Sequence, residues 1–192
     1  TQSAGLVALH GPTLAGRLEG GPARYDRATF IAALTSTEPV GELPAPELET
    51  VRRGEAAGPL TGGTLTLLAA SLGTPYAFDP PPGSIVFLDE VNERPYRLDR
   101  LLTQLRLAGI LERTAAIVFN ELPGCDEPDG QVTARSVIAR LLHGFPGPVV
   151  VGLPSGHAIG PALTLPFGAT ARVVAHHASA RVIIEEAAAS ST

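Results

Sequence analysis

Two acidic residues and one histidine stand where short apolar runs end, and these residue types can do catalytic chemistry together. Asp89 and Glu90 directly follow the run Ser84–Leu88 (SIVFL). His157 lies in a glycine-framed loop after the run Pro148–Leu153 (PVVVGL). A carboxylate held on rigid backbone can orient an imidazole, which then acts as a general base. Neighbouring residues on a strand point to opposite faces, so only one of the two acids can face His157. The alternative interpretation is a solvated strand end.

Ser155 is the candidate nucleophile within the same loop, two residues before His157. A nucleophilic serine is typically exposed on a sharp turn beside backbone donors, as in the pattern Gly-x-Ser-x-Gly. The local sequence, Gly152-Leu-Pro-Ser-Gly156, does not fit this pattern, and serine before glycine is typical of ordinary turns. We therefore expect Ser155 to be a turn residue.

The other histidines and a glycine pair give only weak site predictions. His10 precedes a Gly-Pro turn and is expected to be structural. His176 and His177 are adjacent, so their side chains point to opposite faces of a strand and cannot both bind one metal ion. Gly62 and Gly63 open a predicted helix that could bind an anion, but the motif lacks the Lys-Ser/Thr of a phosphate loop. No metal site and no cofactor are expected.

The hydrophobic pattern predicts alternating strands and helices. Continuous apolar runs indicate buried strands, and apolar residues at helical spacing indicate helices. Strands are expected over Ala4–Leu9, Ser84–Leu88, Ala115–Phe119 and Pro148–Leu153, and helices over Asp26–Leu34, Thr61–Leu72, Tyr96–Ala108 and Val132–Leu142. A connector is expected over Ser36–Pro59, and a terminal β-hairpin over Ala171–Val174 and Arg181–Ile184. This order predicts an α/β fold, buried strands flanked by helices, with functional residues beyond the carboxyl ends of the strands.

The composition is that of a globular chain of 192 residues, 44% hydrophobic and 17% charged. The net charge of −5 argues against nucleic acid or an anionic membrane as the main partner. The single cysteine, Cys125, excludes an internal disulfide and a cysteine-based zinc site. No apolar run approaches the ~20 residues of a membrane span, so a soluble chain is expected. Methionine is absent even at position 1, which indicates a chain processed or cut from a longer one.

Four longer segments carry a resemblance to a known family. They are residues 5–12 (GLVALHGP), 60–76 (LTGGTLTLLAASLGTPY), 85–105 (IVFLDEVNERPYRLDRLLTQL) and 152–168 (GLPSGHAIGPALTLPFG). In order and approximate separation they resemble the serine LD-carboxypeptidases, the muramoyltetrapeptide carboxypeptidases. The resemblance implies two domains and a Ser–Glu–His triad, with the serine on a Gly-x-Ser-Asp turn of the N-terminal domain. It also implies cleavage of the terminal D-alanine from recycled muropeptide tetrapeptides, in the cytoplasm.

The chain departs from the family pattern at the nucleophile and at the acid. Only Thr1-Gln-Ser-Ala precedes the first segment, and Ser3 lacks the glycine and aspartate of the nucleophile turn. Where the family has Leu-Glu-Asp, this chain has Leu-Asp-Glu at 88–90, so the resemblance assigns the acid role to Asp89, with Glu90 as the alternative. Thr64 stands where the family often has Asn.

The resemblance therefore implies a tail of the nucleophile domain over residues 1–16, a helix and connector over 17–59, and a C-terminal catalytic domain over 60–192. The isolated chain is expected to be inactive, because it lacks the serine. The alternatives are a microcin-type self-immunity peptidase, which uses the same triad on a peptidyl-nucleotide, and a non-catalytic module that binds peptidoglycan fragments. The expected partners are a muropeptide or small-peptide substrate and the nucleophile domain, with a homodimer left open.

Overall fold

Four parallel strands form the centre of the molecule. The computed structural model describes residues 5–189, so Thr1 and Ser3 lie outside the described residues. The parallel strands are β4 (Gly54–Thr64), β5 (Ser84–Asp89), β6 (Thr114–Asn120) and β7 (Val149–Leu153). They belong to an eight-stranded sheet of order β2-β10-β9-β4-β5-β6-β7-β3. Because the four strands run in one direction, their carboxyl ends meet at one edge.

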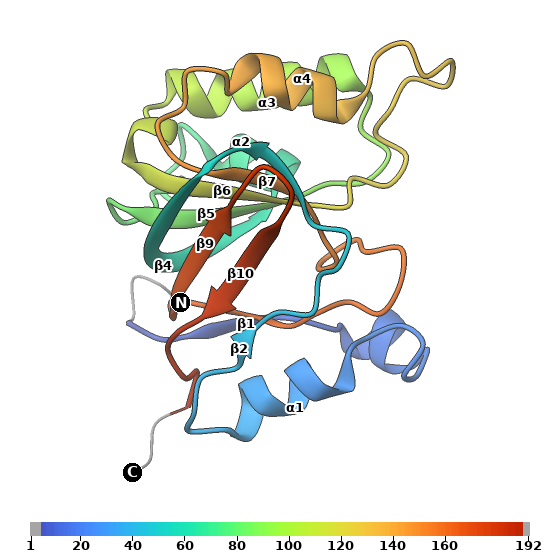
Figure 1. Cartoon of the computed structure of the whole chain (residues 1–192), viewed down its shortest axis with the longest axis vertical. Helices are drawn as coiled ribbons and strands as arrows, with labels where there is room; N and C mark the ends of the chain where they lie inside the picture. The colour runs from blue at the N-terminus through green and yellow to red at the C-terminus, as the bar shows by residue number, and fades with distance from the viewer. Residues whose placement is uncertain (1–4, 190–192) are drawn as a thin grey trace.

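Three helices cover one face of this sheet. They are α2 (Leu65–Ser71), α3 (Pro95–Leu107) and α4 (Ala134–Leu141), and α3 and α4 lie together above the strands in Figure 1. The apolar face of α3 buries Leu98, Leu102 and Leu105 against Val86 and Leu88 of β5. The spacing of these leucines is that of one helical face, so the amphipathic pattern in the sequence fixes which side of α3 meets the sheet. A short 3₁₀ turn, η3 (Leu111–Arg113), leads from this layer into β6.

The opposite face is covered by the rest of the chain. The hairpin β9 (Thr170–Ala175) and β10 (Ala180–Ile184) extends the sheet and bends across this face. Two short strands, β2 (Gly41–Glu42) and β3 (Glu49–Arg52), occupy the two edges. A two-stranded sheet of β1 (Ala8–His10) and β8 (Leu165–Phe167), the turn η2 (Leu14–Leu18) and α1 (Arg27–Thr35) complete the molecule. A hydrophobic core lies on this face of the sheet as well, and it includes Phe87 and Val118 of the central strands.

The fold class predicted from the sequence is confirmed, including the terminal hairpin, but two element predictions are wrong. The helix expected over Thr61–Leu72 begins only at Leu65, because Gly62 and Gly63 are the last part of β4. A Cβ on Gly62 would collide with the carbonyl oxygen of Phe87 on β5, so this close strand pairing requires glycine. The connector expected over Ser36–Pro59 contains β2, β3 and half of β4, whose Gly- and Pro-rich sequence shows no clear alternation.

Within the described residues, no helix combines the length and the apolar character needed to cross a lipid bilayer.

Candidate active site

The carboxyl ends of the four parallel strands bring polar side chains to one place. Thr64 ends β4, Asp89 ends β5, Asn120 ends β6, and the loop that follows β7 carries His157. We call residues 154–161 the His157 loop. Asp89 and Asn120 are almost completely buried, whereas the side chain of His157 is 48% exposed. The site thus consists of a buried group of polar side chains and one imidazole that reaches solvent.

Asp89 contacts His157 through both of its carboxylate oxygens. The distance from Asp89 Oδ2 to His157 Nδ1 is 2.7 Å, and Asp89 Oδ1 accepts a hydrogen bond from the backbone N–H of His157 at 2.9 Å. An acceptor at Nδ1 favours the tautomer with the proton on Nδ1, which leaves a lone pair on Nε2. No hydrogen-bond partner of Nε2 lies among residues 5–189. The free nitrogen can therefore accept a proton from an incoming group.

Gly156 makes this close approach sterically feasible. Its φ is 64°, in the region that favours glycine, and a Cβ there would lie 2.6 Å from both carboxylate oxygens of Asp89. A side chain at position 156 would thus push the His157 loop away from the acid. The contact between the loop and Asp89 therefore explains why a glycine precedes His157 in the sequence.

Asn120 and Thr64 complete the surroundings of the acid. The amide of Asn120 donates to Asp89 Oδ1 at 2.7 Å and to the Glu90 carbonyl oxygen at 3.1 Å, and its oxygen accepts from the backbone N–H of Glu90 and Leu122. Thr64 Oγ1 donates weakly to Asp89 Oδ2 at 3.4 Å. All four hydrogen bonds of Asn120 serve to fix the ends of β5 and β6. Sequence reasoning missed Asn120, although it is the polar residue that closes a buried apolar run.

Glu90 faces the other side of the sheet and does not approach His157. Its carboxylate accepts hydrogen bonds from the backbone N–H and the hydroxyl of Thr66, at 2.9 and 2.6 Å, and from the backbone N–H of Val91. The bond to the Thr66 N–H places a negative charge at the N-terminus of α2, where it satisfies one of the free backbone donors of the first turn. The carboxylate therefore occupies the place where the sequence suggested an anion site near Gly62 and Gly63. Of the two acids that the sequence offers, only Asp89 lies against the imidazole.

Comparisons with known proteins identify the family of this chain. The model of the LD-carboxypeptidase C-terminal domain matches residues 57–173. The chain belongs to the LD-carboxypeptidase family. A protein of Streptomyces coelicolor named as a carboxypeptidase is 38% identical over 172 residues, covering 88% of this chain and 53% of that protein. The murein tetrapeptide carboxypeptidase of Pseudomonas aeruginosa is 31% identical over 159 residues, covering 80% of this chain and 52% of that protein.

A solved structure extends the similarity to the fold. The muramoyltetrapeptide carboxypeptidase of Oxalobacter formigenes matches with a TM-score of 0.79 and 28% identity, over 95% of this chain and 62% of that one. The chain spans about half the length of the two relatives named above, so it corresponds to one part of an LD-carboxypeptidase.

Two residues considered in the sequence have structural positions in this LD-carboxypeptidase chain. Ser155 is fully buried, and its hydroxyl donates to the Leu163 carbonyl oxygen at 2.9 Å, which closes the base of the His157 loop. Its oxygen is thus not available to attack a substrate. The ring of His10 packs against Phe87 and Phe167, with centroids 5.4 and 5.1 Å away. Burial lowers the pKa of His10. Both residues behave as the sequence predicts.

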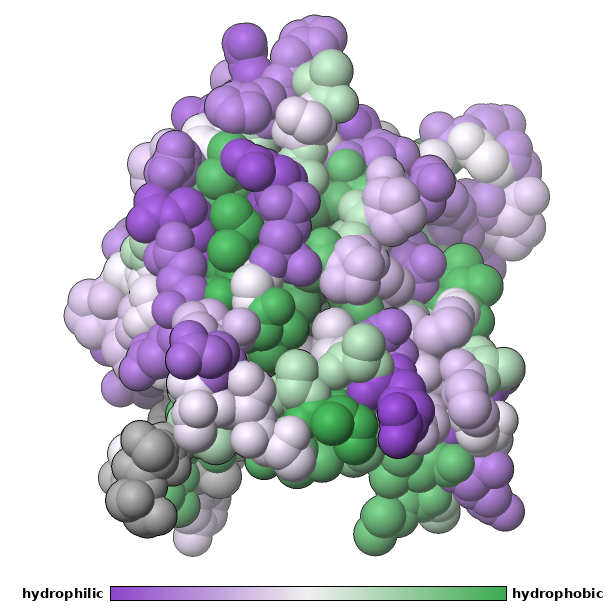
Figure 2. Space-filling model, turned by 60° about the horizontal axis from the view of Figure 1, so that its bottom comes forward, coloured by the Kyte–Doolittle hydropathy of each residue, from purple (hydrophilic) through white to green (hydrophobic). Residues whose placement is uncertain are grey.

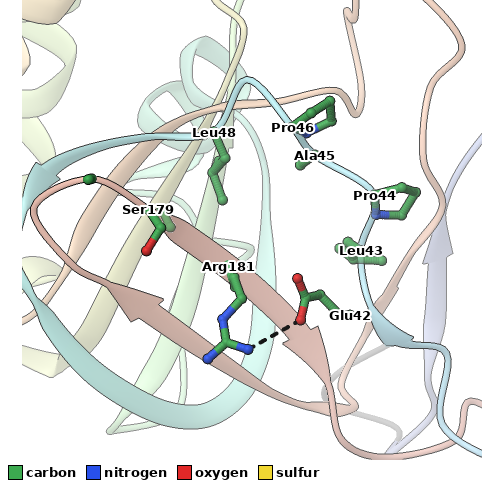
Figure 3. A pocket seen from close by; sticks show the side chains of 10 residues that line it. Glu42, Leu43, Pro44, Ala45, Pro46, Leu48, Ser179 and Arg181 are labelled. Atoms are coloured by element: carbon green, nitrogen blue, oxygen red, sulfur yellow. Dashed lines mark hydrogen bonds and ion pairs between the residues drawn. The ribbon is translucent and has the colours of Figure 1, made fainter.

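Two cavities lie beside the segment Leu43–Leu48, which joins β2 to β3. One, of about 470 Å³, lies between this segment and β10, where Arg181 contacts Glu42 (Figure 3). The other, of about 330 Å³, is bounded by the same segment, Glu121 and Gly160 of the His157 loop. Of these two cavities, only the second touches the His157 loop, at Pro154, Gly160 and Pro161.

Proposed function

We propose that this chain supplies the acid and the base of a serine-type LD-carboxypeptidase. The reaction is release of the terminal D-alanine from muropeptide tetrapeptides, as part of peptidoglycan recycling in the cytoplasm. One observation carries the proposal, namely the 2.7 Å contact between His157 Nδ1 and buried Asp89, with the imidazole half exposed. The murein tetrapeptide and muramoyltetrapeptide substrates named for the relatives supply the substrate class.

The proposed chemistry is acyl transfer, in which His157 moves the proton from the nucleophile to the leaving group. His157 Nε2 takes the proton of a serine hydroxyl while the serine oxygen attacks the carbonyl carbon of the bond to D-alanine. Asp89 stabilises the imidazolium formed in this step, and backbone N–H groups hold the oxyanion. Nε2–H then gives the proton to the leaving D-alanine nitrogen. Water, activated by the same nitrogen, hydrolyses the remaining ester and restores the serine.

The serine itself is proposed to come from a segment outside the 192 residues. Ser155 is buried and engaged, as described above. Two large apolar side chains are exposed, Ile159 of the His157 loop at 73% and Leu14 of η2 at 84%, and such exposure fits a surface that another domain covers. Figure 2 shows hydrophobic side chains gathered near the lower edge of the face that comes forward from the bottom of Figure 1.

The test is release of D-alanine from a muramoyl tetrapeptide by two proteins. The protein that includes the upstream Gly-x-Ser-Asp segment should release D-alanine, and the 192-residue chain alone should show no release above the blank. Turnover by the chain alone that disappears in Ser155→Ala would overturn the proposal and make Ser155 the nucleophile.

The same assay separates the alternatives. Cleavage of a peptidyl-nucleotide, without release of D-alanine from the tetrapeptide, would indicate a microcin-type self-immunity peptidase. Binding of the tetrapeptide with no cleavage, in a protein that has no Gly-x-Ser-Asp segment upstream, would indicate a peptidoglycan-fragment binding module. Either outcome would replace the carboxypeptidase proposal.

A further inference from the structure

The backbone of the His157 loop is held by side chains from three distant parts of the chain. The N–H of His157 donates to Asp89, as described above. The next carbonyl, that of Ala158, accepts from Arg17 Nη2 at 2.8 Å. The N–H of Ile159 donates to Glu121 Oε2 at 2.7 Å. The carbonyl of Gly160 accepts from Arg17 Nη1 at 3.2 Å. Four consecutive residues thus each have one backbone group bonded to a charged side chain.

Among residues 5–189, the guanidinium of Arg17 donates only to backbone carbonyl oxygens. Besides the two bonds to the loop, Nη1 donates to the carbonyl oxygen of Arg24 at 2.7 Å. No carboxylate forms an ion pair with Arg17 within the described residues. The planar guanidinium can satisfy several fixed acceptors at once, which an ammonium cannot do. Arg17 therefore ties the segment after β1 to the loop.

Glu121 acts on the same loop from the end of β6. It follows Asn120 directly, so one strand end carries both the amide that holds Asp89 and the carboxylate that holds Ile159. Packing does not fix the loop at Ile159, because that side chain is largely exposed. The polar contacts are what restrain the backbone there.

We propose that Arg17 and Glu121 are positioning residues that fix the direction of the His157 imidazole through the backbone of its loop. Their catalytic importance rests on the function proposed above, whereas the restraint itself is a property of this chain. Neither side chain is required to touch the substrate or the reacting atoms. A proton acceptor misplaced by 1 Å loses much of its rate advantage, so a half-exposed imidazole on a loop needs such restraint.

The first experiment measures amide hydrogen exchange by NMR in the 192-residue chain. Glu121→Ala should speed exchange of the Ile159 N–H by about tenfold or more, because that N–H loses a charge-assisted bond. Glu121→Gln keeps an acceptor oxygen and should restore most of the protection. Glu47→Ala is the matched control, since Glu47 lines the same cavity and has no bond to the loop. Equal exchange in Glu121→Ala and Glu47→Ala would overturn the proposal.

The second experiment observes the imidazole directly. A ring proton held between His157 Nδ1 and a buried carboxylate resonates at low field when its exchange with water is slow. Arg17→Gln should broaden or abolish this resonance while the native fold is kept, and Arg27→Gln, which removes the same charge from the exposed start of α1, should leave it unchanged. An unaltered resonance in Arg17→Gln would contradict the proposal. If one of the two positions tolerates no substitution, the other still decides the outcome.

These readouts do not depend on turnover, so failure of the restraint and failure of the carboxypeptidase function are distinguishable. In the protein that includes the nucleophile segment, Glu121→Ala should lower kcat about tenfold with little change in KM, and Glu121→Gln should recover it. Loss of loop protection without any change in kcat would refute the catalytic part of the proposal.

Discussion

Replacing Asp89 by Asn should abolish most of the activity for a reason that the hydrogen bonds define. Asp89 Oδ1 accepts from two donors whose identity is fixed, the backbone N–H of His157 and the Asn120 amide. The oxygen of the new amide must therefore occupy the Oδ1 position. Its NH₂ group then lies where Oδ2 meets His157 Nδ1. The imidazole must accept at Nδ1 and carry its proton on Nε2, which removes the lone pair needed for catalysis.

The expected loss is about 10⁴-fold in kcat, or roughly 5 kcal/mol of transition-state stabilisation, as for a triad imidazole locked in the wrong tautomer. The fold should persist, because the amide is nearly isosteric and keeps two of the hydrogen bonds. We therefore expect a change in the free energy of unfolding of at most about 1–2 kcal/mol, within the range of single neutral hydrogen bonds.

The assay is D-alanine release by the protein that includes the nucleophile segment, with urea unfolding as the measure of stability. Glu90→Gln is the matched control, since it removes the neighbouring charge but leaves the contacts of His157 unchanged. It should cost stability at the start of α2 and no more than a few-fold in kcat. If Glu90→Gln abolishes turnover and Asp89→Asn is mild, the assignment of the acid from this geometry is wrong.

Three further predictions concern the surroundings of the site. Burial lowers the pKa of His10 below its ordinary value of 6.5, so on acidification the unfolded chain binds a proton at this residue before the folded chain does, and stability should fall below about pH 6.5. His10→Phe should weaken this fall in urea unfolding measured at pH 7.5 and 5.5. Identical pH dependence in the two proteins would contradict the reasoning. Gly156→Ala should lower the free energy of unfolding in urea by about 1–3 kcal/mol, because the new methyl group would collide with Asp89. Gly160→Ala should be nearly neutral, since a methyl group there has no neighbour within 4 Å. Equal effects of the two substitutions would refute the steric role of position 156. Burial raises the pKa of Cys125 to about 11, so the thiol of the folded chain should resist a disulfide reagent at pH 8 and should react fully in urea. Rapid reaction of the folded chain would show that the Cys125 thiol is exposed.

The pairing of Asp89 with His157 could be predicted from the sequence because its cause is simple. One short apolar run ends at Asp89 and another leads into the loop that carries His157, and parallel strands bring such ends together even though 68 residues separate Asp89 from His157. The choice of Asp89 over Glu90 follows from strand alternation once the register is known. The buried runs of β5, β6 and β7 and the amphipathic pattern of α3 are likewise predicted correctly, whereas the central strand β4 was missed because Gly and Pro interrupt its apolar pattern.

The restraints on the loop could not be predicted in this way. Arg17 lies 143 residues from Gly160, and nothing in its sequence surroundings distinguishes it from the other arginines of the chain. Whether its guanidinium meets the loop depends on the path of the chain after β1. The edge strands β2 and β3 were missed because Gly and Pro dominate their surroundings and neither strand is long enough to show a period of two.

Those short edge strands bear on how the protein behaves at high concentration. An open sheet edge is a template on which another chain can add a strand, and long, flat, uncharged edges do so most readily. Here one edge is only the two residues of β2, and the other is the four residues of β3. The second edge also carries charge, with Glu49 paired to Arg135 and Arg52 donating to the His143 carbonyl oxygen. The sheet thus presents little backbone for intermolecular pairing, although its central strands are rich in valine, isoleucine and phenylalanine.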